Sequence, residues 1–564
     1  MKHPENKLSF EQAVQFHQQG HLELAEKVCN AILKKFPVHA PAHHLLGVIA
    51  HQRNQFDLAL QLMQQSIEEN PKIASYYSNL GALLRENGDP VAAIPILRKA
   101  IELQPELADA LFNLGSALSD VHQDTEAKEY FLKTIEIQSD YAKAHNGLGT
   151  ILRDQFDFVG SLQHLQAALN IDPAYAFCYA NTGATYFELR QLDKVVAYCQ
   201  KAIELEPTLA CAIELLGAAC QELGQLEMSE GFMLRASALE PSNADYLWHL
   251  GLTRLALGKL EQGWIGYEYR LKKSTPVAHS EFPYPNWQGE NGKDKCILVW
   301  GEQGIGDQIM NASMYGDLIL HFRKCIFACA TKLVPLYARS FPKAEIVSLD
   351  DKQKLADYDQ IIDVQSAAGS LARWLRPNIA SFPKNEFFLV PNGERVNYWK
   401  RRLAELGPEL TVGICWRSSD MKGTRAFYCS KLDQWGTIFA VPGVRFINLQ
   451  YDECSEELRA AKQLFDVDIH SFEEIDLYND IDETAALSRA LDLVISAPTA
   501  AGILAAANGV PTWWMTSGFL WQKLGTKEIC WYRTLRTFEK SWVQEWEVVI
   551  DNVADELKKL VTAH

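Results

Sequence analysis

The sequence has little that would mark a membrane protein, a metal site or a disulfide framework. No segment runs for about 18 apolar residues without polar interruption, and the opening residues, MKHPENKLSFEQ, contain no apolar signal region. The 12 cysteines form no CxxC pair, and the 15 histidines form no HExxH cluster. We therefore expect a cytoplasmic protein with reduced cysteines, no membrane span, no protein-bound metal and no cofactor.

An excess of basic residues is also lacking. The chain has 54 lysines and arginines against 71 aspartates and glutamates, a formal net charge of -17. A phosphate backbone or an anionic lipid surface would be repelled overall, so nucleic acid and membrane surfaces are not expected partners. With 564 residues, 48% of them hydrophobic, the chain is long enough for two or three packed domains.

What the first half does have is a repeat. Two unrelated residue types recur every 34 positions, which makes chance a poor explanation. Proline ends the second helix of a pair because it lacks a donor and blocks helix continuation, while glycine lets a neighbouring helix come close. Each repeat is thus predicted to be a helical hairpin. The prolines are Pro37, Pro71, Pro105, Pro173, Pro207 and Pro241, with Ser139 in place of proline in one repeat. The glycines are Gly47, Gly81, Gly115, Gly149, Gly183, Gly217 and Gly251.

This pattern resembles the tetratricopeptide family, including its small residues where the two helices pack, such as Ala59, Ala93 and Ala127. We count seven units from about residue 6 to 243 and a partial one ending near Lys272. The resemblance implies an α-solenoid over residues 1–272. A solenoid has a concave face and no inherent chemistry, so we expect it to hold an extended segment of a protein partner.

One position of the repeat gathers the asparagines Asn79, Asn113 and Asn181, and Asn146 lies one place off it. An asparagine amide both donates and accepts, so a row of them could pair with a peptide backbone whatever its side chains. In the tetratricopeptide-bearing protein glycosyltransferases that this chain resembles, such a row holds the acceptor. The alternative is that asparagine merely suits the family position and faces water, and that the two arginines are solvated. The candidate acceptor-binding residues are Asn79, Asn113, Asn146, Asn181, Arg85 and Arg153.

The second half alternates apolar runs of strand length with helical segments, which predicts parallel sheets. Two series of such runs, one from CILVW to QIIDV and one from TVGICW to LDLVIS, indicate two doubly wound lobes. Ligands bind at the carboxyl ends of the strands in such sheets. The final segment has helical period and is predicted to pack across the lobes. The predicted divisions are a linker at 273–292, lobes at 293–395 and 396–545, and a final helix at 546–564.

The phrase GEQGIGDQ, residues 301–308, follows the first predicted strand. Its glycines have neither the spacing of a dinucleotide fingerprint nor the Gly-Lys-Ser/Thr of a Walker loop. Together with PNWQGE, GICWRSS, INLQY, DLVISAPT and WYRTLRTF, it resembles the heptosyltransferase-related GT-B glycosyltransferases, in the branch that carries tetratricopeptide repeats. The resemblance covers roughly residues 282–545 and implies a GT-B fold of two lobes.

Glycosyl transfer needs a base for the acceptor hydroxyl and dipolar or positive groups for the leaving phosphate. Asp307 aligns with the Gly-Asp carboxylate of the family, which makes it the candidate catalytic base. The alternative is that Asp307 only caps the helix that follows. Gly304 and Gly306 are expected to let donor and acceptor approach the backbone.

The second lobe supplies the candidate donor-binding groups. Arg417 and Ser418 directly follow the strand TVGICW, and Lys422 and Arg425 come soon after. Such cations could clamp a phosphate. The alternative is a solvated basic loop, which is the better interpretation of Lys422.

A second donor element is the turn after LDLVIS. Ser496, Thr499 and Ala500 lie on it, and the helix that follows offers free amides and a positive dipole end to a phosphate without any metal. Thr499 could instead be a simple helix cap. The heptosyltransferase pattern has Asp-Thr and a later His where this chain has Pro498-Thr499 and Ile503, so a nucleotide-diphosphate heptose is not implied.

The leading hypothesis is an enzyme that moves a sugar from a nucleotide donor to Ser or Thr of a protein delivered by the solenoid. The Ala-Pro-Thr turn, GICWRSS and INLQY resemble the tetratricopeptide flagellin glycosyltransferases of bacteria. That resemblance implies flagellin as acceptor and a CMP-activated nonulosonic acid as donor. The alternatives are a non-catalytic repeat adaptor, and a lipopolysaccharide or capsule sugar transferase.

Overall fold

The computed structural model describes residues 9–273, 282–421 and 423–563. The chain divides into two compact units, one of residues 1–185 with 204–206 and one of residues 186–203 with 207–564. The first unit lies wholly within the repeats. The second contains the last repeats and the whole α/β half, so the compact units divide well before residue 272. None of the described helices combines the length and the apolar character that crossing a bilayer requires.

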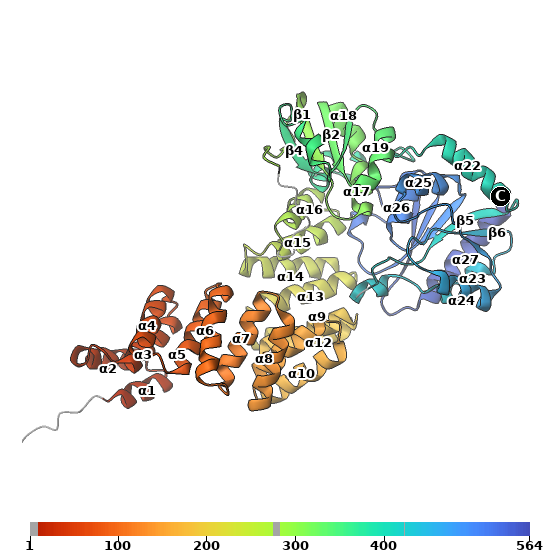
Figure 1. Cartoon of the computed structure of the whole chain (residues 1–564). Coiled ribbons are helices and arrows are strands. Elements are labelled where there is room, and N and C mark those ends of the chain that lie inside the picture. The colour runs from red at the N-terminus through yellow and green to blue at the C-terminus, as the bar shows by residue number, and fades with distance from the viewer. Residues whose placement is uncertain (1–8, 274–281, 422, 564) are drawn as a thin grey trace, which may run out of the picture. The chain divides into compact units, whose positions relative to one another are not determined.

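Helical pairs follow one another through the repeats, and Figure 1 shows successive pairs of the first unit stacked side by side. The helices α1 to α14 occupy the seven predicted units, and α15 and α16 form a further pair that ends in the 3-10 helix η1. Their bounds are α1 Phe10–Gln18, α2 Leu22–Lys35, α3 Ala40–Gln52, α4 Phe56–Glu69, α5 Ala74–Glu86, α6 Pro90–Leu103, α7 Ala108–Asp120, α8 Asp124–Ile137, α9 Ala142–Asp154, α10 Phe158–Ile171, α11 Ala176–Glu188, α12 Leu192–Leu205, α13 Ala210–Glu222, α14 Leu226–Leu239, α15 Ala244–Ala256, α16 Leu260–Tyr267 and η1 Glu268–Lys272.

The repeated glycines serve the close helix contact that the sequence predicts. A Cβ placed on Gly81 would lie 2.4 Å from Leu97, and one on Gly149 would lie 2.7 Å from Leu165. Each of these partners sits on the second helix of the same pair. At Gly251 the approach is closer still, since the Cβ would lie 2.5 Å from the backbone of Gly266.

A second 34-residue period becomes visible only in the backbone. The turn inside each hairpin places one residue in the left-handed region, with φ between +54° and +84°. Half of these residues are glycines and half carry a side chain, for which this conformation costs about 1–2 kcal/mol. They are Gly20, Asn54, Gly88, His122, Phe156, Arg190, Gly224 and Gly258.

This row predicts a simple stabilisation. Phe156 has φ +63° and a half-exposed ring, so Phe156→Gly relieves the strained backbone and should raise the free energy of unfolding of the first unit by about 1 kcal/mol. Gly88→Ala is the reciprocal control, because a Cβ there meets nothing within 4 Å and only the backbone changes. It should lower stability by a similar amount in urea unfolding. A loss for Phe156→Gly would mean that the contact of its ring with Phe158 outweighs the strain.

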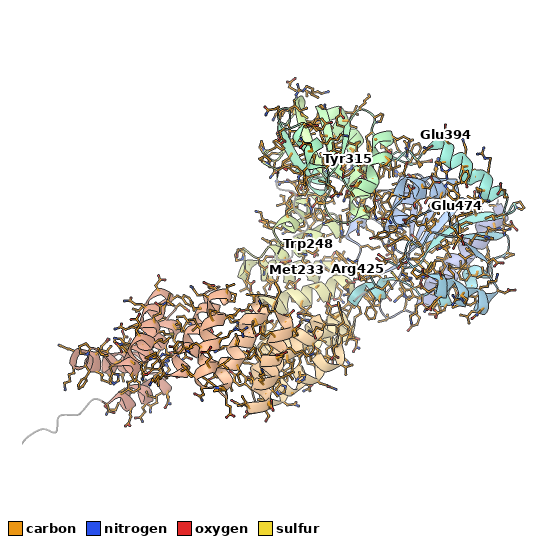
Figure 2. The ribbon with its side chains drawn as sticks, in the orientation of Figure 1. Met233, Trp248, Tyr315, Glu394, Arg425 and Glu474 are labelled. Carbon is orange, nitrogen blue, oxygen red and sulfur yellow. The ribbon has the colours of Figure 1, made fainter. Side chains whose placement is uncertain are left out.

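The first lobe is a four-stranded parallel sheet in the order β3-β2-β1-β4. Apolar side chains cover both of its faces, as a doubly wound sheet requires; Tyr315, labelled in Figure 2, belongs to one of these faces. The elements are β1 Gly292–Trp300, α17 Ile305–Ala312, α18 Tyr315–His321, β2 Phe322–Cys329, η2 Thr331–Leu333, α19 Val334–Ser340, β3 Glu345–Ser348, α20 Lys352–Ala356, β4 Val364–Ala367, η3 Ala368–Leu371, α21 Ala372–Leu375 and η4 Ile379–Ser381.

The second lobe is a six-stranded parallel sheet in the order β10-β9-β8-β5-β6-β7, again with an apolar core on each face. Figure 1 shows α17 of the first lobe beside α26 of the second, and these two helices are in contact. The elements are α22 Gly393–Ala404, β5 Leu410–Cys415, η5 Gly423–Tyr428, η6 Leu432–Gln434, α23 Gly436–Phe439, β6 Val444–Asn448, α24 Ser455–Phe465, β7 Ile469–His470, α25 Ile481–Ala490, β8 Leu493–Ser496, α26 Ala500–Ala507, β9 Thr512–Ser517, η7 Trp521–Lys523, β10 Leu535–Lys540 and α27 Trp546–Ala563.

The predicted two-sheet α/β arrangement is thus confirmed, with differences in detail. The sequence did not predict the strands β7, β9 and β10, and the strand predicted at QIIDV begins only at Val364. The final helix α27 does not bridge the lobes through its buried face. Its buried residues, from Trp546 to Leu557, all join one core of the second lobe. The predicted linker falls partly on residues 274–281, which lie outside the described residues.

The last repeat is built into the first lobe. Leu255, Leu260 and Trp264 are buried in the same core as the strand residues Ile297 and Val299. The α15–α16 pair therefore serves two roles, as the end of the solenoid and as a covering layer of the first sheet.

Candidate functional site

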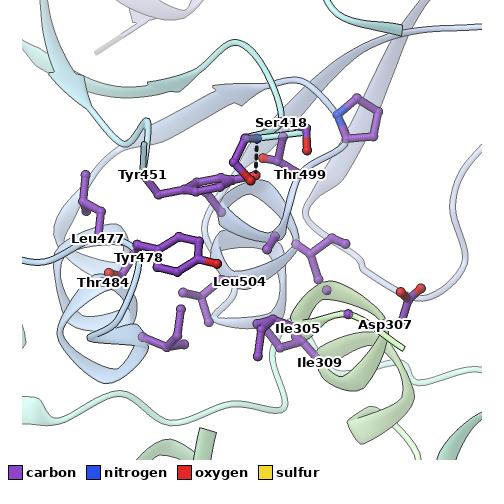
Figure 3. A pocket seen from close by; sticks show the side chains of 18 of the residues that line it. Ile305, Asp307, Ile309, Ser418, Tyr451, Leu477, Tyr478, Thr484, Thr499 and Leu504 are labelled. Carbon is purple, nitrogen blue, oxygen red and sulfur yellow. Dashed lines mark hydrogen bonds between the residues drawn. The ribbon is translucent and has the colours of Figure 1, made fainter. Parts of the chain in front are cut away.

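A cavity of about 540 Å³ lies between the two lobes (Figure 3). The first lobe contributes Asp307 and its neighbours at the start of α17, and the second contributes Ser418 and the start of α26. Several of the predicted site residues therefore lie in one place, although they come from three separate segments of the chain. Those that line the cavity are Gly304, Gly306, Asp307, Ser418, Thr499 and Ala500.

Sheet topology explains the position of the cavity. In the second sheet β5 lies between β8 and β6, so the chain leaves β5 and β8 in opposite directions and opens a crevice at their carboxyl ends. Ser418 follows β5 and Thr499 follows β8. In the first sheet β1 lies between β2 and β4, and residues 301–304 leave from its carboxyl end. Each lobe thus presents its switch point to the cavity.

Asp307 occupies the third position of α17, where it is half-buried. Its carboxylate accepts a hydrogen bond from the amide of Gly304, the residue that precedes the helix. Burial raises the pKa of Asp307 to about 6, and the nearby charge of Glu302 acts in the same direction, while the Gly304 amide and Arg425 oppose the rise. A carboxyl group with a pKa close to neutrality is suited to accept a proton at physiological pH. Asp307 therefore contacts the helix terminus and lines the cavity as well.

The two glycines beside Asp307 differ in what they allow. A Cβ on Gly306 would lie 2.9 Å from the Cδ1 atom of Ile503, so this glycine lets α17 pack against α26. A Cβ on Gly304 would meet only the Asp307 carboxylate, at 3.7 Å, so the backbone there is open to a ligand. The expectation that both glycines admit substrate thus fits the surroundings of Gly304 better than those of Gly306.

The start of α26 forms the wall of the cavity from the second lobe. Thr499 directly precedes the helix, is 5% exposed and makes no side-chain capping bond within the described residues. Its hydroxyl lies 3.4 Å from the sulfur of Cys415 instead. The first amides of a helix have no partner inside it, so those at Ala500 and beyond are available to an anion. Pro498 and Ile503, where the chain departs from the heptosyltransferase pattern, also line this cavity.

Both predicted phosphate-binding arginines lie outside the cavity lining. The Arg417 guanidinium forms ion pairs with Asp452 and Glu457, which hold it against the start of α24. Arg425 is largely exposed and pairs with Asp420 at 3.2 Å, although its charge still reaches Asp307. The sequence could not show these partners, which for Arg417 lie 35 and 40 residues further along the chain.

Ser496 also differs from its predicted place. Its side chain is fully buried under α26, where a Cβ on Gly502 would lie 2.1 Å from its hydroxyl oxygen. This buried hydroxyl packs beneath the helix, and Ser496 is not among the residues that line the cavity. Lys422 lies outside the described residues.

Sequence reasoning missed an aromatic end of the cavity. Tyr451 and Tyr478 line it with ring centroids 6.2 Å apart, and Figure 3 shows both tyrosines on the opposite side from Asp307. Lys332 of the first lobe also lines the cavity; its ammonium lies 3.9 Å from the centre of the Tyr478 ring and donates to the Tyr478 carbonyl at 3.0 Å. The placement of Tyr451 just after β6 was the one available signal, since strand ends of this sheet meet at the cavity. Tyr478 and Lys332 belong to no sequence motif from which their place in the cavity could be predicted.

The asparagines of the row bond to polar side chains of the preceding repeat, and in one case that partner is another asparagine. The Asn181 amide donates to the Asn146 carbonyl oxygen at 2.9 Å, and Asn113 donates to the hydroxyl of Ser78 at 3.4 Å. The Asn79 amide lies 3.0 Å from a ring nitrogen of His44. Each bond joins residues 35 apart, on first helices of successive pairs. The asparagines thus form a polar seam along the first unit, and acceptor binding by them stays a prediction.

The two arginines assigned to the same face have partners of their own. Arg85 pairs with Asp120 at 2.6 Å, and Arg153 pairs with the adjacent Asp154 at 2.9 Å. Both pairs are partly exposed, so a ligand can compete for these cations at modest cost.

Comparison with known proteins identifies the N-terminal half. The tetratricopeptide repeat family matches residues 10–74, and again residues 74–107, 108–141 and 178–209. The repeats are tetratricopeptide repeats. Among the described residues, no cluster of three or more histidine, cysteine, aspartate or glutamate side chains could hold a metal ion.

A curated relative covers a longer stretch. The chain is 34% identical over 311 residues to Protein FlbA of Caulobacter vibrioides, which is 53% of this chain and 52% of that one. The chain thus spans about half the length of the curated relative it matches. Among solved structures, a tetratricopeptide repeat protein from Parabacteroides merdae aligns with 43% of this chain and 96% of its own at 19% identity and a TM-score of 0.37. The Cut9–Hcn1 complex aligns with 43% of this chain and 48% of its own at 16% identity and a TM-score of 0.40.

Proposed function

We propose that the chain is a glycosyltransferase that moves a sugar from a nucleotide-activated donor to a serine or threonine hydroxyl of a protein held by the repeats. One observation carries the proposal. A carboxylate with a raised pKa, Asp307, and the amide end of a helix, at Thr499 and Ala500, line one cavity from opposite lobes. The first supplies a base for the attacking hydroxyl, and the second supplies dipoles for the phosphate that leaves.

The cavity offers three environments in the same order as the base, the phosphate and the sugar of a nucleotide sugar. The tyrosine end, with Tyr451 and Tyr478, suits a base, because aromatic faces stack on aromatic ligands. The α26 terminus lies between these rings and Asp307 (Figure 3), where the phosphate belongs. The sugar then lies next to Asp307. This orientation places the reacting carbon, and not the base, beside the candidate proton acceptor.

The lining favours a donor of low charge. Among the described residues that line the cavity, Lys332 is the one permanent cation, and it already contacts Tyr478. A helix terminus adds roughly half a positive charge. One phosphodiester is balanced better by this set than a diphosphate, which supports the CMP-activated nonulosonic acid that the resemblance to flagellin glycosyltransferases suggests. On that resemblance we also propose flagellin as the acceptor and the cytoplasm as the location.

The competing functions differ in what they require of the cavity. A non-catalytic repeat adaptor needs the solenoid and no base at Asp307. A lipopolysaccharide or capsule transferase needs the cavity and no protein-binding solenoid. The raised pKa of the cavity carboxylate favours an enzyme, and the repeats favour a protein acceptor over a glycan.

The donor is tested by thermal unfolding with CMP, UDP, GDP and ADP. A ligand that binds only the folded state adds about 2.7 kcal/mol at a concentration of 100 times its Kd. We expect CMP to raise the Tm by several degrees and the three diphosphates to raise it less. Ala500→Asp should abolish the shift, because it places a negative charge at the phosphate position while an acidic residue in the first turn suits the helix dipole.

The matched control is Ala108→Asp, the same change at the first position of α7 in the repeats, which should leave the shift intact. No shift with any of the four nucleotides in the wild-type chain contradicts the proposal. A shift that survives Ala500→Asp means that the nucleotide binds elsewhere.

A further inference from the structure

The segment that carries the candidate base is clamped by the last repeat. Residues 301–304 lead from β1 into α17, and Glu302 in their middle is 2% exposed. Its carboxylate receives two hydrogen bonds from Arg270, Nε to Oε2 at 3.0 Å and Nη2 to Oε1 at 2.5 Å. Arg270 belongs to η1, the end of the solenoid, and is 1% exposed. A buried, doubly bonded ion pair thus joins the repeat region to the loop that leads to Asp307.

The clamp has further contacts and little free space. The Gly369 amide donates to the same Glu302 oxygen at 2.8 Å, and Arg270 also donates to the Ser370 hydroxyl at 3.0 Å. A Cβ on Gly369 would lie 2.8 Å from Glu302 and 2.9 Å from Arg270, so a larger residue there would displace the ion pair. The neighbouring Gln303 is in the left-handed region at φ +62°. A residue in that conformation is held by its surroundings.

Stability alone is a weak reason for such a pair. Two charges taken out of water lose about as much as they gain from each other, and apolar replacements are often as stable. A buried pair does, however, fix the geometry of what it joins. Asp307 lies five residues after Glu302, in the first turn of α17. The position of residues 301–304 therefore sets the position of the Asp307 carboxylate in the cavity.

We infer that Arg270 and Glu302 are positioning residues for Asp307, through which the last tetratricopeptide repeat fixes the catalytic geometry. The inference rests on the proposed function. It makes the repeats a structural part of the catalytic site and not only a handle for the acceptor.

The pair should also affect the proton affinity of Asp307. Around this carboxylate the charged and titratable groups are Glu302, Arg425, Tyr267 and Tyr532, and Lys332 lines the same cavity. Glu302 raises the pKa of Asp307, so neutralising it should lower that pKa. A base is active when deprotonated, and the acid limb of the pH–rate profile, expected near pH 6 in the wild type, should then move to lower pH.

The test is the double variant Arg270→Met with Glu302→Gln. It removes both charges together, leaves no unpaired buried ion and keeps an oxygen for the Gly369 amide. We expect a folded protein whose kcat falls about tenfold or more, since a small misplacement of a reacting group costs about 10²-fold. The acid limb should move from its wild-type position, CMP should still raise the Tm, and amide hydrogen exchange at residues 301–308 should accelerate.

Asp317→Asn is the matched control. Asp317 also stands third in a helix of the first lobe and pairs with a buried arginine, Arg376 at 2.7 Å, which contacts Ser313 at the opposite end of α17 from the loop. It should change neither the pH profile nor exchange at residues 301–308. Unchanged exchange and an unchanged profile in a folded double variant overturn the inference. If instead the wild-type chain binds no nucleotide and transfers nothing, the proposed function itself fails, and the positioning role fails with it.

Discussion

Asp307→Asn should lower the rate of sugar transfer by about 10²–10⁴-fold, the range that a positioned general base contributes. Asparagine keeps the size of the side chain and can still accept the hydrogen bond from the Gly304 amide, so α17 should form normally. It cannot take a proton from the acceptor hydroxyl. Steady-state transfer to the protein acceptor measures the loss, and CMP binding, followed by thermal unfolding, should stay within about twofold because the proposed phosphate site lies on α26.

The control for this substitution is again Asp317→Asn. The sequences Ile-Gly-Asp and Tyr-Gly-Asp open α17 and α18 in the same way, so the two variants remove the same helix-start carboxylate with and without a cavity beside it. A full rate for Asp307→Asn would exclude this residue as the base. Full partner binding without transfer in the wild type would favour the adaptor.

A chain that begins at residue 273 should fail to fold into a soluble protein. The α15–α16 pair gives Leu252, Leu255, Leu260, Trp264 and Tyr267 to the core of the first lobe. Burial of each such side chain is worth about 1.5–3 kcal/mol, so their removal costs on the order of 10 kcal/mol. That equals the whole stability of a typical domain.

The loss of two polar anchors adds to this cost. The Trp264 indole donates to the Arg376 carbonyl at 2.9 Å, and Glu302 would be left without Arg270. Soluble expression and a cooperative unfolding transition are the measurements. A chain lacking only residues 1–73, the first two repeats, is the control and should remain soluble and bind CMP, since repeats contact mainly their neighbours. A cooperative, soluble 273–564 fragment would show that the shared core is dispensable.

This expectation decides how the acceptor hypothesis can be tested. Removal of the whole solenoid would destroy the first lobe and inactivate any transferase, whatever its acceptor. Shortening within the first unit keeps the cavity intact. A transferase for small glycans should then keep its rate, whereas one for a protein should lose transfer to its acceptor.

The solenoid could be predicted from the sequence because its evidence is periodic. The proline that recurs every 34 residues predicts where helices end, and the glycine with the same period predicts where two helices contact each other. The strands β1, β2, β5 and β8 were also predictable, since each is an apolar run buried on both faces. β10, with Arg536 and Glu539 among its six residues, lies at the sheet edge and reads as polar sequence.

The candidate site was predictable where it depends on strand ends. Asp307, Ser418 and Thr499 each follow a strand closely, and parallel sheets bring such positions together. Arg417 also follows a strand closely, but ion pairs with residues distant in the sequence turn its side chain away from the cavity. Tyr478 and Lys332 come from loops whose course depends on the packing of the lobes, which no local pattern records.

The left-handed residue at every 34th position gives each hairpin of the solenoid a turn with the same backbone conformation. For the proposed transferase we expect that whole repeats of the first unit can be added, removed or replaced at these turns, so that the choice of acceptor changes and the proposed chemistry does not. The segment after Gly258 is different, because Leu260, Trp264 and Tyr267 are part of the core of the first lobe and Arg270 pairs with Glu302 there. A chimera built to redirect this protein to a new acceptor should therefore exchange repeats upstream and retain its own α15, α16 and η1.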